Sequence, residues 1–187
     1  MMCESRVSQT AWLQKLKDCL PLFGHRNWIV IADAAYPQQT SLGIETVVAD
    51  VDQIEAVSAV LDAVAASGHV RANVSTDLEL NFVSEADAPC VSEYRRQLAG
   101  LVENAHARQI PHEEIIARLE ERARAFRVLI LKTRMAIPYT SVFCELECGY
   151  WSAEAEERLR QAMRSATGSV NASSATDEIQ PEQGDRQ

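Results

Sequence analysis

The hydrophobic and polar positions of this chain form blocks that predict alternating helices and strands. Apolar residues recur every three or four positions between Ser8 and Leu22, which predicts an amphipathic helix capped by Ser8 and ended by Gly24. The next block, Trp28 to Asp33, is short and almost wholly apolar and contains β-branched residues. A run of this length between turn residues is typical of a buried strand.

The same two patterns continue along the chain. We expect further strands at 44–49, 70–74, 126–131 and 141–147, a less regular segment at 78–83 and a loop at 84–89. Further helices are expected from Asp50 or Asp52 to Ala66, from Val91 to Ala105, from Pro111 to Ala125 and from near Ser152. Strands and helices in this order predict a layered α/β fold with a largely parallel central sheet flanked by helices.

The length of 187 residues and the 47% hydrophobic content are those of one globular domain, which we place at residues 1–164. From Ser165 onward the composition shifts to small and polar residues with a single isoleucine after Val170. Such a segment buries too little apolar surface to offset its ordering entropy. We therefore predict a disordered tail over residues 165–187.

The charge of the chain limits its partners. A net charge of −9 and a pI near 5.0 argue against a nucleic-acid partner, because phosphate backbones are bound by clustered Lys and Arg. The arginines between 118 and 127 are interleaved with glutamates, as on a solvated helix face. We find neither a signal-peptide pattern nor an apolar run long enough to span a bilayer, so we expect a cytoplasmic protein without a membrane partner.

The five cysteines form an odd set without a C-x-x-C pair. Cys144 and Cys148 share one face of a predicted strand and could ligate zinc together with a histidine, but the segment supplies too few ligands. Reduced thiols without a metal site are the favoured interpretation.

Two polar residues flank the first predicted strand. His25 precedes it, and its imidazole changes charge near neutral pH. Asp33 ends the strand, and ligands of open α/β sheets bind beyond the carboxyl ends of strands. Taken singly, His25 also fits a helix-terminal cap, and Asp33 also fits an acceptor for backbone donors of the next turn.

Two later segments add candidate groups. His112 lies on the first turn of a predicted helix, and Tyr139, Thr140 and Ser141 place three hydroxyls in a turn before the last strand. Taken singly, His112 also fits a polar helix start, and Tyr139 also fits a half-buried aromatic residue.

Together these segments resemble the D-ribose pyranase and L-fucose mutarotase family. Gly24-His25, the strand, Asp33-Ala34 and Pro37 are similar to the family segment G-H-x-x-x-I/V-V-x-x-D-A-x-x-P. His112-Glu113-Glu114 is similar to the family's histidine-glutamate helix start, and Pro138-Tyr139-Thr140-Ser141-Val142 to its P-Y-A-N-I segment. The segments occur in family order, and the resemblance covers about residues 8–147.

The resemblance implies an isomerase that interconverts cyclic forms of a free monosaccharide, anomers or pyranose and furanose, without a metal or organic cofactor. It assigns His25 as the acid/base, Asp33 and His112 as sugar contacts, and Tyr139 with Thr140 and Ser141 as partners of sugar hydroxyls. It also implies a homo-oligomeric ring with sites near subunit contacts.

This chain departs from the family pattern at two places. Ser141 replaces an asparagine that can donate and accept at once, and Lys132 to Ala136 stands where family members often carry an acid. These departures keep two alternatives open. One is a sugar-binding or regulatory relative without turnover, and the other is a structural or interaction subunit that acts through the C-terminal helix and tail.

Overall fold

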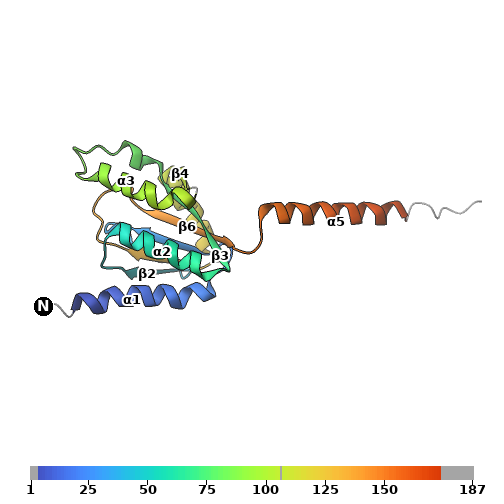
Figure 1. The fold of residues 1–187 in the computed structure, drawn as a ribbon, viewed down its shortest axis with the longest axis horizontal. Coiled ribbons are helices and arrows are strands. Elements are labelled where there is room, and N and C mark those ends of the chain that lie inside the picture. The colour runs from blue at the N-terminus through green and yellow to red at the C-terminus, as the bar shows by residue number, and fades with distance from the viewer. Residues whose placement is uncertain (1–3, 106, 174–187) are drawn as a thin grey trace, which may run out of the picture. The chain divides into compact units, whose positions relative to one another are not determined.

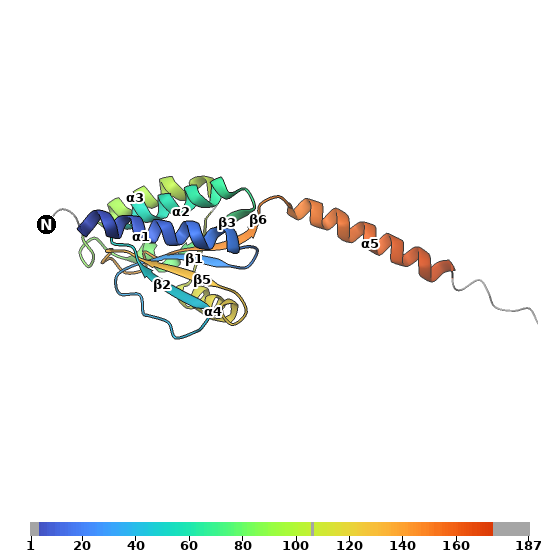
Figure 2. The same cartoon turned by 90° about the horizontal axis from the view of Figure 1, so that it is seen from below.

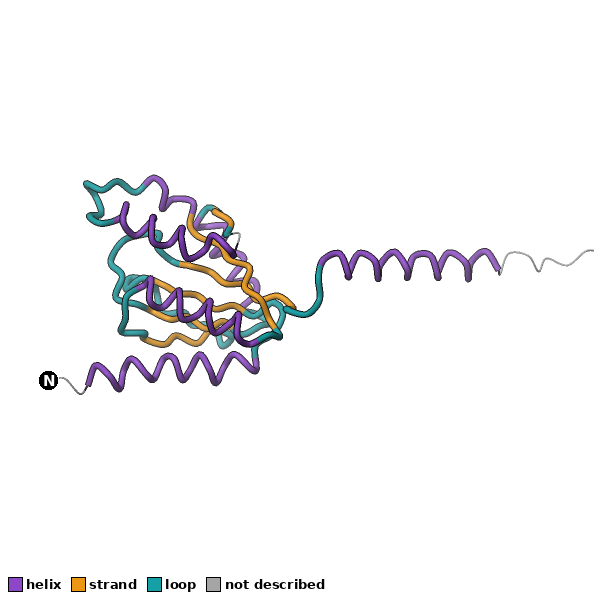
Figure 3. Tube along the Cα trace, viewed as in Figure 1, coloured by secondary structure: helices purple, strands orange, loops and turns teal. Residues whose placement is uncertain are grey.

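The computed structural model describes residues 4–105 and 107–173 and contains helices and strands in alternation (Figure 1, Figure 3). The strands are β1 (Trp28–Ala32), β2 (Ile44–Val48), β3 (Val70–Asp77), β4 (Arg108–Ile110), β5 (Val128–Lys132) and β6 (Val142–Cys148). The α-helices are α1 (Glu4–Cys19), α2 (Gln53–Ser67), α3 (Val91–Val102), α4 (His112–Ala123) and α5 (Ala153–Ser173). Short 3₁₀ helices follow α1, β3 and α3, at Leu20–Leu22, Leu78–Phe82 and Glu103–Ala105.

The six strands form one mixed sheet in the order β2-β5-β1-β6-β3-β4. Strands β2, β5 and β1 pair in parallel, and so do β3 and β4. Strand β6 lies between β1 and β3 and runs antiparallel to both. The predicted α/β fold with a largely parallel sheet is confirmed, with β6 as the reversed strand of the described chain.

The sheet is covered on both faces. Helices α1, α2 and α3 lie on one face and α4 on the other (Figure 2). Side chains of successive strand residues point to opposite faces, so Ile29 and Ile31 pack in the cluster under α1 to α3, and Trp28 and Val30 pack in the cluster with α4. Because both faces are buried, β1 has no exposed residue, which explains its continuous apolar sequence.

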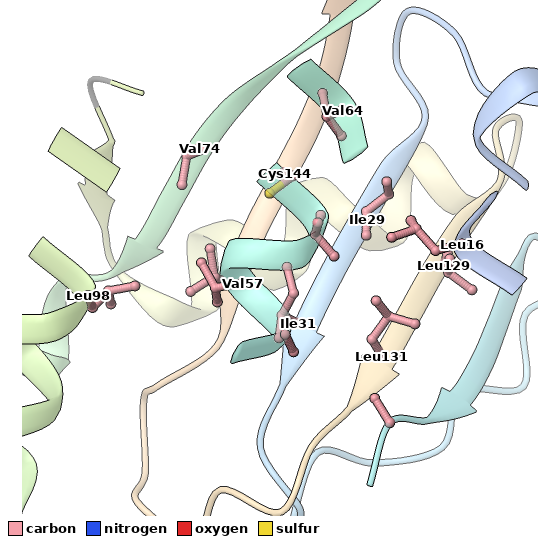
Figure 4. Packing of buried hydrophobic residues seen from close by; sticks show 14 of the residues in the cluster. Leu16, Ile29, Ile31, Val57, Val64, Val74, Leu98, Leu129, Leu131 and Cys144 are labelled. Atoms are coloured by element: carbon pink, nitrogen blue, oxygen red, sulfur yellow. The ribbon is translucent and has the colours of Figure 1, made fainter. Parts of the chain in front are cut away.

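Figure 4 shows the larger cluster, where helix residues meet alternate strand residues. Leu16 of α1 and Val57 and Val64 of α2 pack with Ile31 and Leu131. Both Trp12 and Leu16 are 1% exposed, which confirms the apolar stripe expected for the first helix. The stacking of α1 and α2 over β1 and β5 fixes the strand ends from which the polar loops emerge.

Helix α2 begins and ends where its sequence signals lie. The Asp52 side chain accepts a hydrogen bond of 2.8 Å from the Ile54 amide, which satisfies one free donor of the first turn. Gly68 ends the helix with a φ of 69°, a conformation that glycine adopts without steric cost.

Some boundaries differ from the sequence expectations. Strand β3 continues to Asp77 instead of ending at 74, and the segment after it is a 3₁₀ helix. Strand β4 has three largely polar residues at the sheet edge, paired with residues 75–77, so its sequence lacks the apolar alternation by which strands are recognised.

The chain divides after Tyr150 into two compact units. In the second, the Ser152 hydroxyl accepts from the Ala155 amide, which confirms the expected cap of the last helix. Helix α5 continues to Ser173, past the predicted boundary at 164, and an ion pair between Arg160 and Glu156 stabilises it. The rest of the predicted tail, 174–187, lies outside the described residues.

Among the helices in the described ranges, none has a stretch both apolar and long enough to cross a bilayer.

Candidate functional site

Strand ends that carry polar loops meet at one edge of the sheet, and β6 begins there because it runs opposite to its neighbours. Parallel strands β1, β3 and β4 end at this edge, and the antiparallel β6 begins there. In the register, Val142 of β6 lies between Ile31 of β1 and Thr76 of β3. Asp33 after β1 and Asp77 at the end of β3 therefore flank the turn that leads into β6.

The loops at this edge enclose a cavity of about 310 Å³. This volume lies at the lower end of the range of about 300–1,000 Å³ for small-molecule sites. Its chemically active lining consists of Asp33, Tyr36, Gln39, His112, Glu113 and Tyr139. A second hollow of about 380 Å³ shares Asp33, Ala35 and Pro138 with it.

Asp33 is held in place by the backbone after β1. Its Oδ1 accepts a hydrogen bond of 2.8 Å from the Ala35 amide. This is the local turn contact that aspartate commonly makes, and it fixes the carboxylate while the side chain also lines the cavity. Asp33 thus satisfies a backbone donor of its turn and lines the cavity.

Tyr139 lines the same cavity in a strained backbone conformation. Its φ is 59°, a region that bulky residues rarely adopt, and its side chain is 40% exposed. Its ring meets the His112 ring edge-on, with centroids 5.6 Å apart and an interplanar angle of 80°. The strained turn therefore holds the phenol against the imidazole at the cavity wall.

Thr140 and Ser141 are buried beneath this turn and do not line the cavity. The Thr140 hydroxyl donates to the Ile137 carbonyl over 2.8 Å. In this chain, the Thr140 backbone is part of the scaffold of the site, and sugar contacts by these two hydroxyls stay a prediction.

A buried polar network anchors the same turn to the sheet and two helices. Gln53, at the start of α2, donates to the carbonyls of Thr140 over 2.8 Å and Ile31 over 3.1 Å. The Tyr94 hydroxyl of α3 donates to the Thr140 carbonyl over 2.7 Å, and the Thr133 hydroxyl donates to Gln53 Oε1. These bonds pair polar groups that are shielded from water, so the network fixes the positions of the strand ends.

His112 begins α4 and is tied to two acidic side chains. Its backbone amide donates to the Glu79 carboxylate, with both oxygens 3.0 Å away. Its ring Nδ1 lies 3.1 Å from Oδ1 of Asp77, whose side chain is fully buried. An acid at a helix N-terminus also interacts favourably with the helix dipole.

The buried carboxyl and phenol of the site have raised pKa values. Burial raises the pKa of Asp77 to about 6 against the opposing effect of His112, and the nearby carboxylates Glu79 and Asp33 add to the increase. Burial likewise raises the pKa of Tyr36 to about 12, with Asp77 and Asp33 contributing. Shifted titratable groups beside a cavity are typical of functional sites.

Asp77 gives folding stability a pH dependence of defined sign. Because the folded pKa of about 6 exceeds the ordinary 3.8, the folded state binds the proton more tightly. The contribution is complete below about pH 4 and is lost as the pH rises to about 6, by about 3 kcal/mol. We expect the unfolding free energy of the protein, relative to that of Asp77→Asn, to fall over this interval in urea titrations. A flat difference curve would contradict the assignment.

His25 lies at the other end of β1. It occupies an exposed turn before the strand and does not line the cavity of its own chain. The five residues of β1 alone span about 16 Å, so His25 and Asp33 of one chain are too far apart to contact the same small molecule. Asp33, His112 and Tyr139 come together, whereas His25 does not join them within one chain.

Larger hollows elsewhere lack such convergent chemistry. The cavity of about 570 Å³ beside α3 contains Arg95, whose guanidinium already donates to the carbonyls of Leu80 and Val83. One of about 520 Å³ contains His69, whose Nε2 lies 3.0 Å from the Phe23 carbonyl. Within the described ranges, no cluster of three or more His, Cys, Asp or Glu side chains could hold a metal ion.

Sequence reasoning did not identify Asp77 or Gln53. Asp77 was expected to lie beyond the end of its strand, and only the pairing of Asp77 with Ile110 shows that it shares an edge with His112. Gln53 follows a capping Asp52 and looks like an ordinary polar residue of a first helical turn. The one local signal was a glutamine at a position that helix periodicity places on the buried side.

Residues 10–148 match the model of the RbsD / FucU transport protein family. The solved structure of Bacillus subtilis RbsD complexed with D-ribose is similar to this chain, with a TM-score of 0.52 and 18% identity over 71% of this chain and 91% of that one. This likeness shows a shared fold.

Two further solved structures are similar. The fucose mutarotase from Streptococcus pneumoniae in complex with L-fucose has a TM-score of 0.48 and 18% identity over 71% of this chain and 91% of its own. FucU from Bifidobacterium longum has a TM-score of 0.48 and 15% identity over 72% of this chain and 92% of its own. Among curated proteins, none matches this sequence.

Proposed function

This chain belongs to the RbsD / FucU transport protein family, and from that premise we propose that it interconverts cyclic forms of a free monosaccharide by acid/base ring opening. The observation that carries the proposal is the convergence of Asp33, His112 and Tyr139 on one small cavity. A carboxylate, an imidazole and a phenol provide acceptors and donors for several hydroxyls at once.

The charge of the cavity favours a neutral sugar. Asp33 and Glu113 line it, Asp77 is buried beside His112, and no Lys or Arg is among its described lining residues. A phosphate group would meet carboxylates there without a cationic partner. Free sugars are therefore preferred to sugar phosphates.

The proposed reaction needs two proton transfers. One proton leaves the anomeric hydroxyl and another reaches the ring oxygen while the bond between that oxygen and the anomeric carbon breaks. The open-chain aldehyde then rotates, and a hydroxyl closes the ring again with the transfers reversed. Positioned proton transfer of this kind contributes about 10²- to 10⁴-fold to the rate, with an optimum pKa near the working pH, which suits imidazole.

We assign the proton shuttle to His25 of a neighbouring copy. In its own chain His25 is separated from the cavity by the length of β1, and it lies exposed in the turn before that strand. A head-to-tail contact between identical chains brings two different surface regions together, and it forms a ring where the rotation from copy to copy closes. Such a ring would place His25 of one copy over Asp33, His112 and Tyr139 of the next.

Saturation-transfer NMR on a panel of free pentoses, hexoses and deoxyhexoses tests this function. We expect faster exchange between the cyclic forms of at least one sugar. D-Ribose is the first sugar to test, because the similar Bacillus subtilis RbsD was solved in complex with it. The phosphorylated form of the same sugar serves as the control. It should show no acceleration, because the carboxylates of Asp33 and Glu113 repel its phosphate group. A panel in which no sugar is accelerated would contradict the proposal.

The alternative is a sugar-binding relative without turnover. It is favoured by Ser141, which is buried and provides one hydroxyl where the family pattern has an amide. Under this alternative, sugars would shift the resonances of cavity residues while the exchange rate stayed at its value without protein.

A further inference from the structure

Asp77 contacts the cavity residue His112 but does not line the cavity itself. It is the last residue of β3, its side chain is fully buried, and Oδ1 lies 3.1 Å from Nδ1 of His112. Its second oxygen, Oδ2, is buried and has no hydrogen-bond partner among the described residues. An incompletely paired carboxyl in a protein interior costs free energy, so its presence calls for a functional account.

The contacts of His112 fix its ring in one orientation. The amide of the residue is held by Glu79, the ring edge by Tyr139, and Nδ1 by Asp77. The side chain nevertheless remains 29% exposed and lines the cavity. Nδ1 therefore faces the buried acid, and Nε2 is the ring nitrogen left for a ligand.

We infer that Asp77 is a positioning residue that holds His112 as the Nδ1–H tautomer, so that the Nε2 lone pair accepts a hydrogen bond from a sugar hydroxyl. An ionised carboxylate only accepts, so a neutral imidazole bonded to it must carry its proton on Nδ1. Carboxylates that orient a functional imidazole in this way recur in metal sites and hydrolases. The identity of the ligand as a sugar rests on the proposed function, whereas the tautomer of His112 does not depend on it.

A purely stabilising ion pair fits the site less well. Such a pair gains stability when its carboxylate is well paired and its pKa lowered, whereas burial raises the pKa of Asp77. The titratable groups coupled to Asp77 are His112 of α4, Glu79 of the following 3₁₀ helix, Asp33 and Tyr36 after β1, and Tyr94 of α3. The carboxylates Glu79 and Asp33 oppose ionisation of Asp77, the phenols are uncharged where Asp77 titrates, and His112 is the basic partner.

The tautomer can be measured directly by ¹⁵N NMR of the histidine side chains at about pH 8, above the range in which Asp77 titrates. We expect the Nδ1–H tautomer for His112 in the unaltered chain and a shift of the proton to Nε2 in most molecules of Asp77→Ala. Asp77→Asn, which retains the shape of the side chain, should give a mixture, because an amide can donate as well as accept. Glu79→Gln is the matched control, since the Glu79 carboxylate accepts from the His112 backbone amide and not from its ring. At about pH 8 the tautomer of this variant should be unchanged.

Kinetics of sugar exchange give the second readout. Loss of one oriented hydrogen bond should reduce kcat/KM of Asp77→Ala about tenfold. An Nε2–H tautomer in the unaltered chain, or a retained Nδ1–H tautomer in Asp77→Ala, would overturn the inference even if sugars were turned over. Absence of exchange with the expected tautomers would instead refute the proposed function alone.

Discussion

Replacing His25 by alanine is expected to slow sugar ring opening by a factor of about 10²–10⁴, because it removes the assigned proton shuttle. The fold should not change. The His25 side chain is exposed, and the turn is held by hydrogen bonds that do not involve it. The Arg26 amide donates to the Leu146 carbonyl over 2.8 Å, and the Gly24 amide donates to the Asn27 side-chain Oδ1 over 2.8 Å. Exchange rates from saturation-transfer NMR and thermal unfolding curves of both proteins check the two parts of this expectation.

A mixing experiment tests whether His25 acts on the cavity of another copy. His25→Ala and His112→Ala should each be inactive alone, since each lacks one half of every site. Random mixing in a ring would pair an intact cavity with an intact His25 in about one quarter of the contacts. Activity should therefore reappear when the two variants are unfolded and refolded together.

Two results would contradict this assignment. If His25→Ala retained the full exchange rate, His25 would have no part in the mechanism. If both variants were inactive and their mixture also stayed inactive after subunit exchange had been demonstrated, His25 would not act across a contact between copies.

Replacing Gln53 by leucine is expected to lower the free energy of unfolding by about 3 kcal/mol. The side chain is 0% exposed and pairs with the carbonyls of Ile31 and Thr140 and with the Thr133 hydroxyl. Leucine has a similar volume but neither donates nor accepts, so buried polar groups at three strand ends lose a partner. Chemical denaturation monitored by circular dichroism measures the loss.

The matched control is Glu55→Gln, an exposed residue of the same first helical turn, which should change stability by less than about 0.5 kcal/mol. Because the Thr140 carbonyl anchors the turn that carries Tyr139, Gln53→Leu should also weaken sugar binding. A loss of stability no larger than that of the control would show that the network contributes little.

Much of the fold follows from local sequence because the signals are strong there. The apolar run of β1 and the stripe of Trp12 and Leu16 each determine which residues are buried. The Asp52 cap and Gly68 fix the ends of α2 through backbone hydrogen bonding and a positive φ. These features depend on residues close together in the chain, so periodicity and capping rules suffice to find them.

The candidate site followed from sequence in part. The end of a strand predicted the position of Asp33, and the helix start predicted that of His112, and both residues line the cavity with Tyr139. The sequence placed His25 and Asp33 at opposite ends of one predicted strand. It could not show that His112 and Tyr139 gather at the Asp33 end, because the pairing of distant strands is not a local property. It also gave no sign that Thr140 and Ser141 are buried beneath the turn.

The order of residues by itself determined which segments form strands and helices and which polar groups follow the strands, since these depend on neighbours a few positions away. Only the tertiary structure decided that β6 runs in reverse between β1 and β3, and this reversal brings the Tyr139 turn to the edge where Asp33 and His112 lie. It also decided that Asp77, 35 positions from His112, becomes the partner of that imidazole. Strand pairing depends on the packing of the whole sheet, and no short stretch of sequence contains that information.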